Sequence, residues 1–330
     1  MCSNVSIKTP LISSEEIQKT PLRYRSAASN NNPELWICYD EIMITVTCNV
    51  LTAIFVSIAY ASPTNDLVEP QPNIVVFLVD DLGWQDTSVP FHSEVTPFNE
   101  LYNTPNWERL AAHGTKYTNA YSAGPVCTPS RTSLLTGQSP ARMHITYWTL
   151  YKDKDTSKKH PTLSPPMWDL DALQPDDLTL PKLLQEAGYH TIHVGKAHLG
   201  AVDSPGGEPT NLGFDVNVSG HGAGGPGSFY GTHRFMSTRY SMEFTNKQVW
   251  DVPGLEKYHD QEIFLSEALA IEACNTLDKA VATGKPFFLH FAPYAVHTPI
   301  MPNPKYIAKY ADIDKIEAAY ATMIESVDAA

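Results

Sequence analysis

The chain has 330 residues, of which 42% are hydrophobic and 18% charged, so its composition is that of a globular protein rather than a disordered one. This length suffices for one large domain or two ordinary ones. The formal net charge of −13 argues against a nucleic-acid-binding protein, which needs a basic face for the phosphates. Any site for an anionic substrate must therefore be locally positive.

The first feature along the chain is an apolar, uncharged run over residues 42–61, which ends in Ala59-Tyr60-Ala61. Small residues at this spacing after an apolar run are typical of a signal-peptidase site, so we interpret residues 43–61 as a signal peptide. The length of the run also permits an uncleaved membrane anchor, and only then would the protein bind a membrane. Both interpretations predict export. Residues 1–42 are then an N-terminal extension, expected to be disordered, and residues 62–71 a linker.

The five cysteines support no disulfide framework. Cleavage after Ala61 leaves Cys127 and Cys274, which form one disulfide at most. If Cys127 has another use, Cys274 is an unpaired thiol in a helical segment, and we expect it to be a small buried core residue.

The segment after the linker alternates strand and helix patterns. Residues 73–81 form a continuous β-branched and aromatic run, which is typical of a strand covered on both faces. Thr104, Pro105 and Gly114 predict the start and end of a short helix. Two further elements follow, a strand candidate over residues 115–122 and a helix with Pro129 in its first turn that ends near Gly137.

The second half of the chain continues this alternation. We expect a long surface loop over residues 151–178 and an ordered glycine-rich loop over residues 206–231, the latter without helix or strand. The remaining predicted elements are a helix and strand within 180–196, a helix over 263–283, a strand within 285–297 and a final helix over 313–330. The pattern predicts an α/β sandwich with a mainly parallel central sheet flanked by helices.

Two adjacent carboxylates, Asp80 and Asp81, close the first predicted strand. In such sheets, ligands bind at the carboxyl ends of the strands. Adjacent carboxylates repel each other at a buried strand end, so a cation or strong hydrogen-bond donors must lie near them. Their oxygens suit Ca²⁺ or Mg²⁺ rather than zinc. An aspartate that caps a following helix gives the same local pattern.

Cys127 follows the second strand candidate and precedes Pro129 and Arg131. As a thiol nucleophile it would need a histidine base, which the sequence does not locate in space. As a buried core residue it would not need Arg131, which one helical turn carries back towards position 127.

Four motifs together resemble the cysteine-type sulfatases, a family within the alkaline-phosphatase-like superfamily. The segment C-T-P-S-R with the following T-S-L-L-T-G matches the signature C-x-P-S-R and its downstream leucine, threonine and glycine. It is joined by Asp80-Asp81, by G-K-A-H-L-G at residues 195–200 and by H-T-P at residues 297–299, all in the family's order. The resemblance covers the chain from Pro72 to its end and implies that residues 72–330 are a sulfatase catalytic domain.

The resemblance implies that Cys127 is converted after translation to Cα-formylglycine by a maturation enzyme that reads C-x-P-S-R. The hydrated aldehyde is a geminal diol. One hydroxyl attacks the sulfur of a sulfate monoester, and the second then expels sulfate and regenerates the aldehyde. A serine in this place could be sulfated but would have no second hydroxyl to release the sulfate.

The resemblance also implies a metal site. Asp80 and Asp81, together with the diol at position 127, would bind one divalent cation, Ca²⁺ or alternatively Mg²⁺. That ion would act as a Lewis acid on a sulfate oxygen and lower the pKa of the attacking hydroxyl. Arg131 would hold the diol through charge-assisted hydrogen bonds.

Three further residues receive roles by similarity. Lys196 resembles the lysine that grips the sulfate. His198 resembles the histidine that takes a proton from the diol when sulfate is expelled. His297 resembles the general acid near the leaving oxygen.

One departure from the family pattern concerns the end of the chain. The family supplies further metal ligands after the helix represented here by residues 320–330. A hard cation takes six or more oxygens, so a site with two carboxylates binds it poorly. We therefore expect this chain to be the N-terminal part of a sulfatase, incomplete at its C-terminus, with weak or no activity.

Two rival functions are compatible with the same motifs. One is a phosphate mono- or diester hydrolase of the same superfamily, because phosphate and sulfate are both tetrahedral anions. The other is a non-catalytic, sulfatase-like binding protein in which Cys127 stays a thiol. A carbohydrate sulfate ester is the substrate that the resemblance favours.

The substrate pocket is expected to be shaped by the loops 151–178 and 201–250. Their tryptophans, Trp168 and Trp250, either stack on sugar rings or anchor the loops. Ser219 and His221 are loose candidates for substrate contact. His193 is expected to be structural, because strand alternation places it opposite Val194. Asn217 begins a glycosylation sequon.

Overall fold

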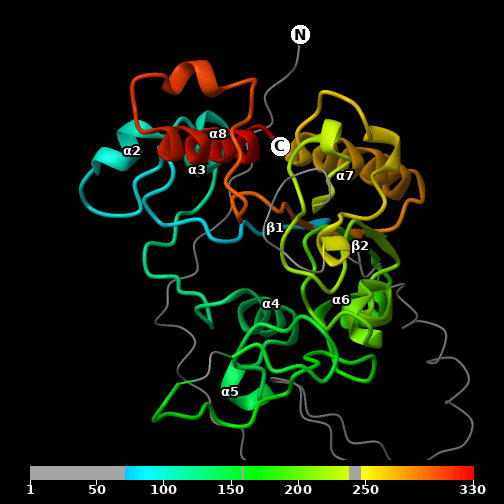
Figure 1. Cartoon of the computed structure of the whole chain (residues 1–330). Helices are drawn as coiled ribbons and strands as arrows, with labels where there is room; N and C mark the ends of the chain where they lie inside the picture. The colour runs from blue at the N-terminus through cyan, green and yellow to red at the C-terminus, as the bar shows by residue number, and fades with distance from the viewer. Residues whose placement is uncertain (1–70, 158–159, 238–246) are drawn as a thin grey trace, which may run out of the picture. The chain divides into compact units, whose positions relative to one another are not determined.

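A four-stranded sheet lies at the centre of the structure, a computed structural model that describes residues 71–157, 160–237 and 247–330 (Figure 1). The strands are β1 (Ile74–Phe77), β2 (His190–Gly195), β3 (Val216–Val218) and β4 (Phe287–Ala292). Their order is β1-β4-β2-β3 and each neighbouring pair is parallel. The predicted parallel sheet is therefore confirmed.

The strands β2 and β4 alternate their side chains between two apolar layers. Leu289 and Phe291 join one core cluster together with Val194, whereas Phe288 joins the other. This alternation follows from the two-residue period of a strand, and both faces of the central strands are covered. The result is the expected α/β arrangement with helices on each side of the sheet.

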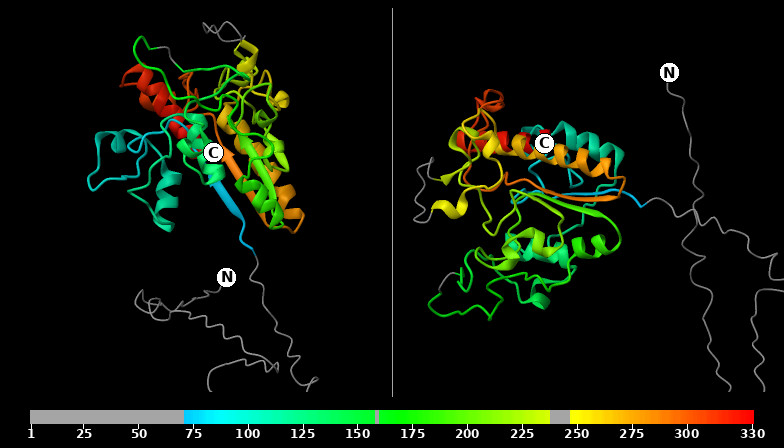
Figure 2. Two further views of the ribbon diagram at one scale, coloured as in Figure 1. Left: turned by 90° about the horizontal axis from the view of Figure 1, so that it is seen from below. Right: turned by 90° about the vertical axis from the view of Figure 1, so that its right-hand side faces the viewer.

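The helices divide between the two faces, as Figure 2 shows. On one side are α3 (Pro105–His113), α7 (Leu265–Ala282) and α8 (Lys315–Ala329); on the other are α4 (Cys127–Thr136) and α6 (Leu180–Glu186). Two short helices, α2 (Pro97–Leu101) and α5 (Pro140–Met143), complete the set, with short 3₁₀ turns between them. Residues 69–330 form one compact unit.

Local sequence signals explain the ends of the predicted helices. Pro105 occupies the first turn of α3, and Gly114 follows its last residue. At the end of α4, Gly137 adopts a left-handed conformation with φ 67°, and its N–H donates to Ser133 O at 2.9 Å. Asp314 caps α8, because its carboxylate accepts from two backbone N–H groups of the first turn.

Four expectations were wrong. Strand β1 is not covered on both faces, because Val75 and Phe77 are exposed. Residues 115–122 form no strand; all are exposed, and no described strand lies beside them to pair with. The glycine-rich segment contains a strand, β3, which pairs with β2. Cys274 is exposed on α7, not buried. Residues 151–178 form no described helix or strand, as expected, although Ala172 and Leu173 are buried in a core cluster.

The predicted extension over residues 1–42 and the predicted signal peptide or anchor over residues 43–61 lie outside the described residues, as does all of the predicted linker except Gln71. Among the helices that the structure describes, none combines the length and apolarity that crossing a membrane requires.

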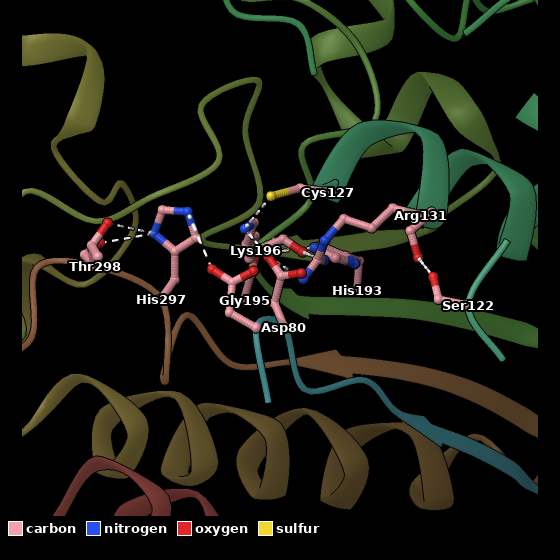
Figure 3. Close-up of polar contacts among 11 residues, drawn as sticks. Asp80, Ser122, Cys127, Arg131, His193, Gly195, Lys196, His297 and Thr298 are labelled. Carbon is pink, nitrogen blue, oxygen red and sulfur yellow. Dashed lines mark hydrogen bonds and ion pairs between the residues drawn. The ribbon is translucent and has the colours of Figure 1, made fainter. Parts of the chain in front are cut away.

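The topology brings the motif residues to one edge of the sheet. Asp80 and Asp81 follow β1, Lys196 follows β2, and His297 lies shortly after β4. Because these strands are parallel neighbours, their carboxyl ends meet at the same edge. Helix α4 begins with Cys127 above this edge (Figure 3).

Candidate active site

Asp80 is the electrostatic centre of the cluster. Its Oδ2 accepts a hydrogen bond from Lys196 Nζ and lies 3.5 Å from the guanidinium NH2 of Arg131. The side chains of both cations are buried, with exposed fractions of 0% for Lys196 and 1% for Arg131. Two cations buried in this way need a compensating anion, and Asp80 provides it.

The pKa of Asp80 depends on its burial and on these two neighbouring cations. Burial by itself would raise the pKa of the carboxyl group, since it disfavours the charged form. The charges of Arg131 and Lys196, with the hydrogen bond from Lys196, outweigh burial and hold the pKa of Asp80 well below its usual range. Asp80 is therefore an anion at any physiological pH.

Cys127 is the first residue of α4 and faces this charge cluster (Figure 3). Lys196 Nζ lies 3.3 Å from its Sγ and donates towards it. Burial raises the pKa of the Cys127 thiol, and the nearby charge of Lys196 only partly opposes this. The thiol is thus a weak nucleophile as it stands, because the thiolate is the reactive form.

Arg131 lies one helical turn after Cys127 on the same face of α4, as predicted. Its NH1 donates to the backbone oxygen of Lys196 at 2.7 Å and so ties α4 to the end of β2. Its Nε and NH2 are buried and donate no hydrogen bond to any described residue. These guanidinium N–H groups can donate hydrogen bonds to oxygen atoms placed at position 127.

The backbone before Lys196 is closely confined. Gly195 has φ 101°, a conformation that favours glycine, and a Cβ there would lie 2.1 Å from the carbonyl oxygen of Ala292 on β4. The adjacent Lys196 N–H donates to that same oxygen at 2.7 Å. Glycine at position 195 thereby lets Lys196 turn into the cluster.

His198 lies two residues further along, but its ring is hydrogen bonded to a different loop. Its Nε2 donates to Thr149 O at 2.7 Å, which leaves Nδ1 as the nitrogen without a proton. That Nδ1 is buried, has no hydrogen-bond partner among the described residues and lies against Gly224, where a Cβ would come within 2.2 Å. Burial, and next the charge of Lys196, lower the pKa of His198 to about 3, so its ring is neutral.

Asp81 and His297 lie at the outer side of the cluster. The Oδ2 of Asp81 is 3.8 Å from His297 Nε2, and Asp81 has φ 59°, a left-handed conformation that aspartate tolerates better than most residues. The Nδ1 of His297 is 2.8 Å from the backbone oxygen of Thr298, so Nδ1 carries the proton and Nε2 faces Asp81. Burial, and next Lys196, lower the pKa of His297.

The residues at this edge fit a divalent cation. One ligand atom each from Asp80, Asp81 and Cys127 lies within 4.8 Å of the others. The sulfur stands where an oxygen of a formylglycine hydrate would be, and with that oxygen the set is the hard donor set that Ca²⁺ and Mg²⁺ prefer. Arg131 and Lys196 supply donors for oxygens at the same position.

A small pocket of about 70 Å³ opens beside His297. Trp250, Ser237, Thr298 and Pro299 line it together with the backbone of residues 225–227. The other candidate tryptophan, Trp168, instead donates from its indole N–H to Asp155 at 3.3 Å and is not among the residues that line this pocket.

The remaining candidates are structural in their contacts. His193 is buried and shares a hydrogen bond with His290 through the two Nδ1 atoms, 3.0 Å apart, as expected for a structural residue. His221 and the backbone of Ser219 both contact the Tyr294 hydroxyl. The amide of Asn217 donates to Glu208 and to Gly220 O.

Sequence reasoning missed residues that support the site. Thr149 accepts from His198 and itself donates from its N–H to Thr128 Oγ1 at 3.2 Å, next to Cys127. Tyr294 is fully buried three residues before His297. Thr149 lies in an irregular segment without a motif, so no local pattern indicates it. Tyr294 shares the segment after β4 with His297 and could have been suspected from that proximity.

Comparisons with known proteins agree with this geometry. The family described as Sulfatase matches residues 72–330. The chain belongs to the sulfatase family. It is 32% identical over 240 residues to the N-acetylgalactosamine-6-sulfatase of Canis lupus familiaris, covering 70% of this chain and 41% of that protein. It is 31% identical over 265 residues to arylsulfatase J of Mus musculus, covering 79% of this chain and 38% of that protein.

Solved structures give the same assignment of fold. The crystal structure of Ps i-CgsB matches with a TM-score of 0.60 and 30% identity, over 78% of this chain and 53% of that one. The same protein has been solved in complex with k-i-k-neocarrahexaose. The chain thus spans about two fifths to one half of the length of these relatives. The alkaline-phosphatase-like sandwich expected for residues 72–330 is confirmed at the level of the fold.

Proposed function

We propose that the protein is a sulfuric ester hydrolase that releases inorganic sulfate from a carbohydrate sulfate monoester. The observation that carries this proposal is the convergence on position 127 of two carboxylates and a buried lysine, Asp80, Asp81 and Lys196. Conversion of Cys127 to formylglycine would supply a hydrate with one hydroxyl to attack the sulfur and a second to release the sulfate.

The chain's own residues would bind and orient the sulfate. Lys196 is buried and already donates towards position 127, so its ammonium group is placed to hold a sulfate oxygen beside the nucleophile. Arg131 would orient the hydroxyls through its free guanidinium donors. Arg131 and Lys196 are balanced by Asp80 and Asp81, so the bound divalent cation proposed below would make the site locally positive where it binds an anion.

The two histidines would move protons on opposite sides of the cluster. Because burial lowers the pKa of His297, a proton placed on its Nε2 is readily given up, which suits a general acid at the leaving oxygen. His198 is neutral and has an unprotonated Nδ1, as a group that accepts a proton requires.

A divalent cation, Ca²⁺ or alternatively Mg²⁺, would be held by Asp80, Asp81 and position 127. It would supply positive charge to a sulfate oxygen and lower the pKa of a bound hydroxyl. The low pKa of Asp80 supports this role, because a carboxylate must be ionised to bind a metal.

A carbohydrate is the substrate class that the relatives favour. The dog relative is named for N-acetylgalactosamine 6-sulfate, and Ps i-CgsB was solved with a neocarrahexaose. In this chain, the pocket beside His297 has an indole wall in Trp250, and a pyranose ring can stack on such a surface. We propose that this pocket receives part of the sugar.

Two further proposals concern biosynthesis. Residues 43–61 would direct export, as a cleaved signal or as an anchor, because they combine an uncharged apolar run with an A-x-A end. A formylglycine-generating enzyme would be the maturation partner, since C-T-P-S-R is present at residues 127–131.

Coexpression of the protein with a formylglycine-generating enzyme tests the function. We expect the tryptic peptide of residues 117–131 to lose its sulfur. The protein should release sulfate from N-acetylgalactosamine 6-sulfate only slowly, because two carboxylates bind a hard cation weakly. Cys127→Ser should take up sulfate once and retain it. Comparison of an aryl sulfate with an aryl phosphate separates sulfatase from phosphatase activity. A peptide that keeps its thiol, together with no release of sulfate, would refute the proposal.

A further inference from the structure

His221 connects three segments that are distant in the sequence. Its backbone oxygen accepts from the N–H of His198 at 3.1 Å. Its ring Nε2 lies 3.3 Å from Val249 O, and its ring Nδ1 lies 3.0 Å from the Tyr294 hydroxyl. One residue of the β3–η4 loop, where η4 is the 3₁₀ turn Gly231–His233, therefore contacts the loop after β2, the segment before Trp250 and the segment after β4.

The donor and acceptor atoms in the contacts around His221 follow from the chemistry of each group. Val249 O can only accept, so Nε2 of His221 carries the proton and Nδ1 is an acceptor. The Tyr294 hydroxyl then has one proton and two acceptors, His221 Nδ1 at 3.0 Å and Ser219 O at 2.8 Å. Tyr294 is fully buried, so loss of its hydroxyl leaves two buried acceptors, His221 Nδ1 and Ser219 O, without the donor that they share.

Each segment held by this group carries a part of the candidate site. The N–H of His297 donates to Tyr294 O at 3.0 Å, so the position of Tyr294 fixes the start of the turn that holds His297. Val249 directly precedes Trp250, which lines the pocket beside His297. His198 is fixed through its backbone N–H. His221 itself is not among the residues grouped around position 127 or lining that pocket.

We propose that His221 and Tyr294 are positioning residues that hold the proton-transfer histidines and the tryptophan wall in one fixed arrangement around the leaving group. This inference rests on the proposed function and extends it to residues outside the signature motifs. Burial lowers the pKa of His221, which keeps its ring in the neutral form that the contacts with Val249 and Tyr294 require. His221 is a loose candidate for substrate contact by sequence, and its contacts in the structure assign it a different role.

Two substitutions at position 221 separate the two ring contacts of His221, with Val249 O and with the Tyr294 hydroxyl. In His221→Gln, the side-chain amide reaches the place of Nε2 and keeps the bond to Val249, but the Tyr294 hydroxyl loses His221 Nδ1 and is left with Ser219 O alone. In His221→Asn, the shorter amide lies near the place of Nδ1, so the acceptor for Tyr294 is kept and the bond to Val249 is lost. Tyr294→Phe removes the hydroxyl from the other side.

The two losses should have different kinetic signatures in the mature protein, with N-acetylgalactosamine 6-sulfate as the probe. His221→Gln and Tyr294→Phe should lower kcat about 10- to 100-fold with little change in KM, since small displacements of acid and base groups have effects of this order. His221→Asn should mainly raise KM, about 10-fold, because the segment before the pocket wall at Trp250 loses its bond to His221. Calcium affinity and conversion of Cys127 should match the parent protein in all three variants.

Matched controls are available at sites away from the cluster. His190→Gln changes a histidine at the opposite end of β2, which contacts Asp215. Tyr310→Phe removes a buried hydroxyl that contacts Glu325. Both should keep the parent kcat and KM. If the parent protein turns over and His221→Gln and Tyr294→Phe keep its kcat, the inference alone is overturned. The same holds if their kcat falls no further than in the two control variants. Absence of turnover in the parent overturns the proposed function and the inference together.

Discussion

Replacement of Asp80 by asparagine should destabilise the protein far more than the same change at Asp81. The two carboxylates are neighbours and both are proposed metal ligands, but their surroundings differ. The Asp80 side chain is 14% exposed and compensates two buried cations. The Asp81 side chain is 53% exposed, and its one ion-pair partner among the described residues is His297 at 3.8 Å. In metal-free protein, Asp80→Asn leaves Arg131 and Lys196 as buried charges without an anion.

The expected size follows from this difference in burial. Removing one partner of a buried ion pair costs about 3–5 kcal/mol, and removing one partner of an exposed pair costs at most about 1 kcal/mol. For a unit of this size, 1 kcal/mol corresponds to about 2–4 °C in Tm. Asp80→Asn should therefore lower Tm by about 6–20 °C, and Asp81→Asn by less than about 4 °C.

Thermal unfolding followed by circular dichroism in the presence of EDTA measures both changes. Added Ca²⁺ should raise the Tm of the parent protein, because a ligand that binds only the folded state stabilises it, and should raise the Tm of either variant much less. Equal Tm losses for the two variants in EDTA would refute the reasoning, since burial would then not distinguish the two carboxylates.

Three further predictions address the scaffold and the thiol. Gly195→Ala should destabilise the protein more than its control, Gly188→Ala. Both positions have positive φ, but only at Gly195 would a Cβ meet a carbonyl oxygen of β4, at 2.1 Å. In urea unfolding, we expect a loss of about 1 kcal/mol for Gly188→Ala and at least about 3 kcal/mol for Gly195→Ala. Burial lowers the pKa of His193 to about 3, so between pH 6.5 and 3 the unfolded chain binds more protons than the folded one, and stability falls as the pH falls. His193→Gln should reduce that slope by up to about 1.4 kcal/mol per pH unit, measured as unfolding free energy at pH 4, 5 and 6, and an unchanged slope would contradict the neutral buried ring. In unconverted protein, iodoacetamide should label exposed Cys274 at least ~10-fold faster than Cys127, whose pKa burial raises; peptide mass spectra report the order, and equal rates would contradict the buried thiol.

The elements that the sequence predicted well are those with strong local signals. The strands β2 and β4 consist largely of apolar and β-branched residues, a pattern that burial on both faces requires. Strand β1 has the same composition and was predicted as a strand, although it lies at the edge of the sheet with Val75 and Phe77 exposed. Helices α3 and α4 were bounded correctly because Pro105 and Gly137 fix backbone conformations by themselves. Such signals need no knowledge of distant residues.

The errors come from features that depend on distant contacts. Residues 115–122 have strand-like composition, but a strand exists only where a partner lies beside it. Helix α7 has two apolar stripes, one through Leu269 and Ala273 and another through Ala270 and Cys274, and only the first is fully buried. Periodicity alone does not decide between two such stripes.

The candidate site shows the same division. Arg131 was found from the signature C-T-P-S-R and Lys196 from G-K-A-H-L-G, because both motifs resemble family patterns. The contact of both residues with Asp80 depends on how α4 and β2 pack, and the His221–Tyr294 contact depends on three loops at once. No local pattern encodes such contacts.

The burial of the signature segment limits when a maturation enzyme can act. In the folded protein, residues 127–131 form the first turn of α4, and Thr128, Pro129 and Arg131 are buried. An enzyme that reads these side chains in an extended segment cannot reach them without unwinding the helix and opening the core. If Cys127 is converted, the reaction therefore belongs to the nascent chain, and chains that fold first should remain permanently as thiols.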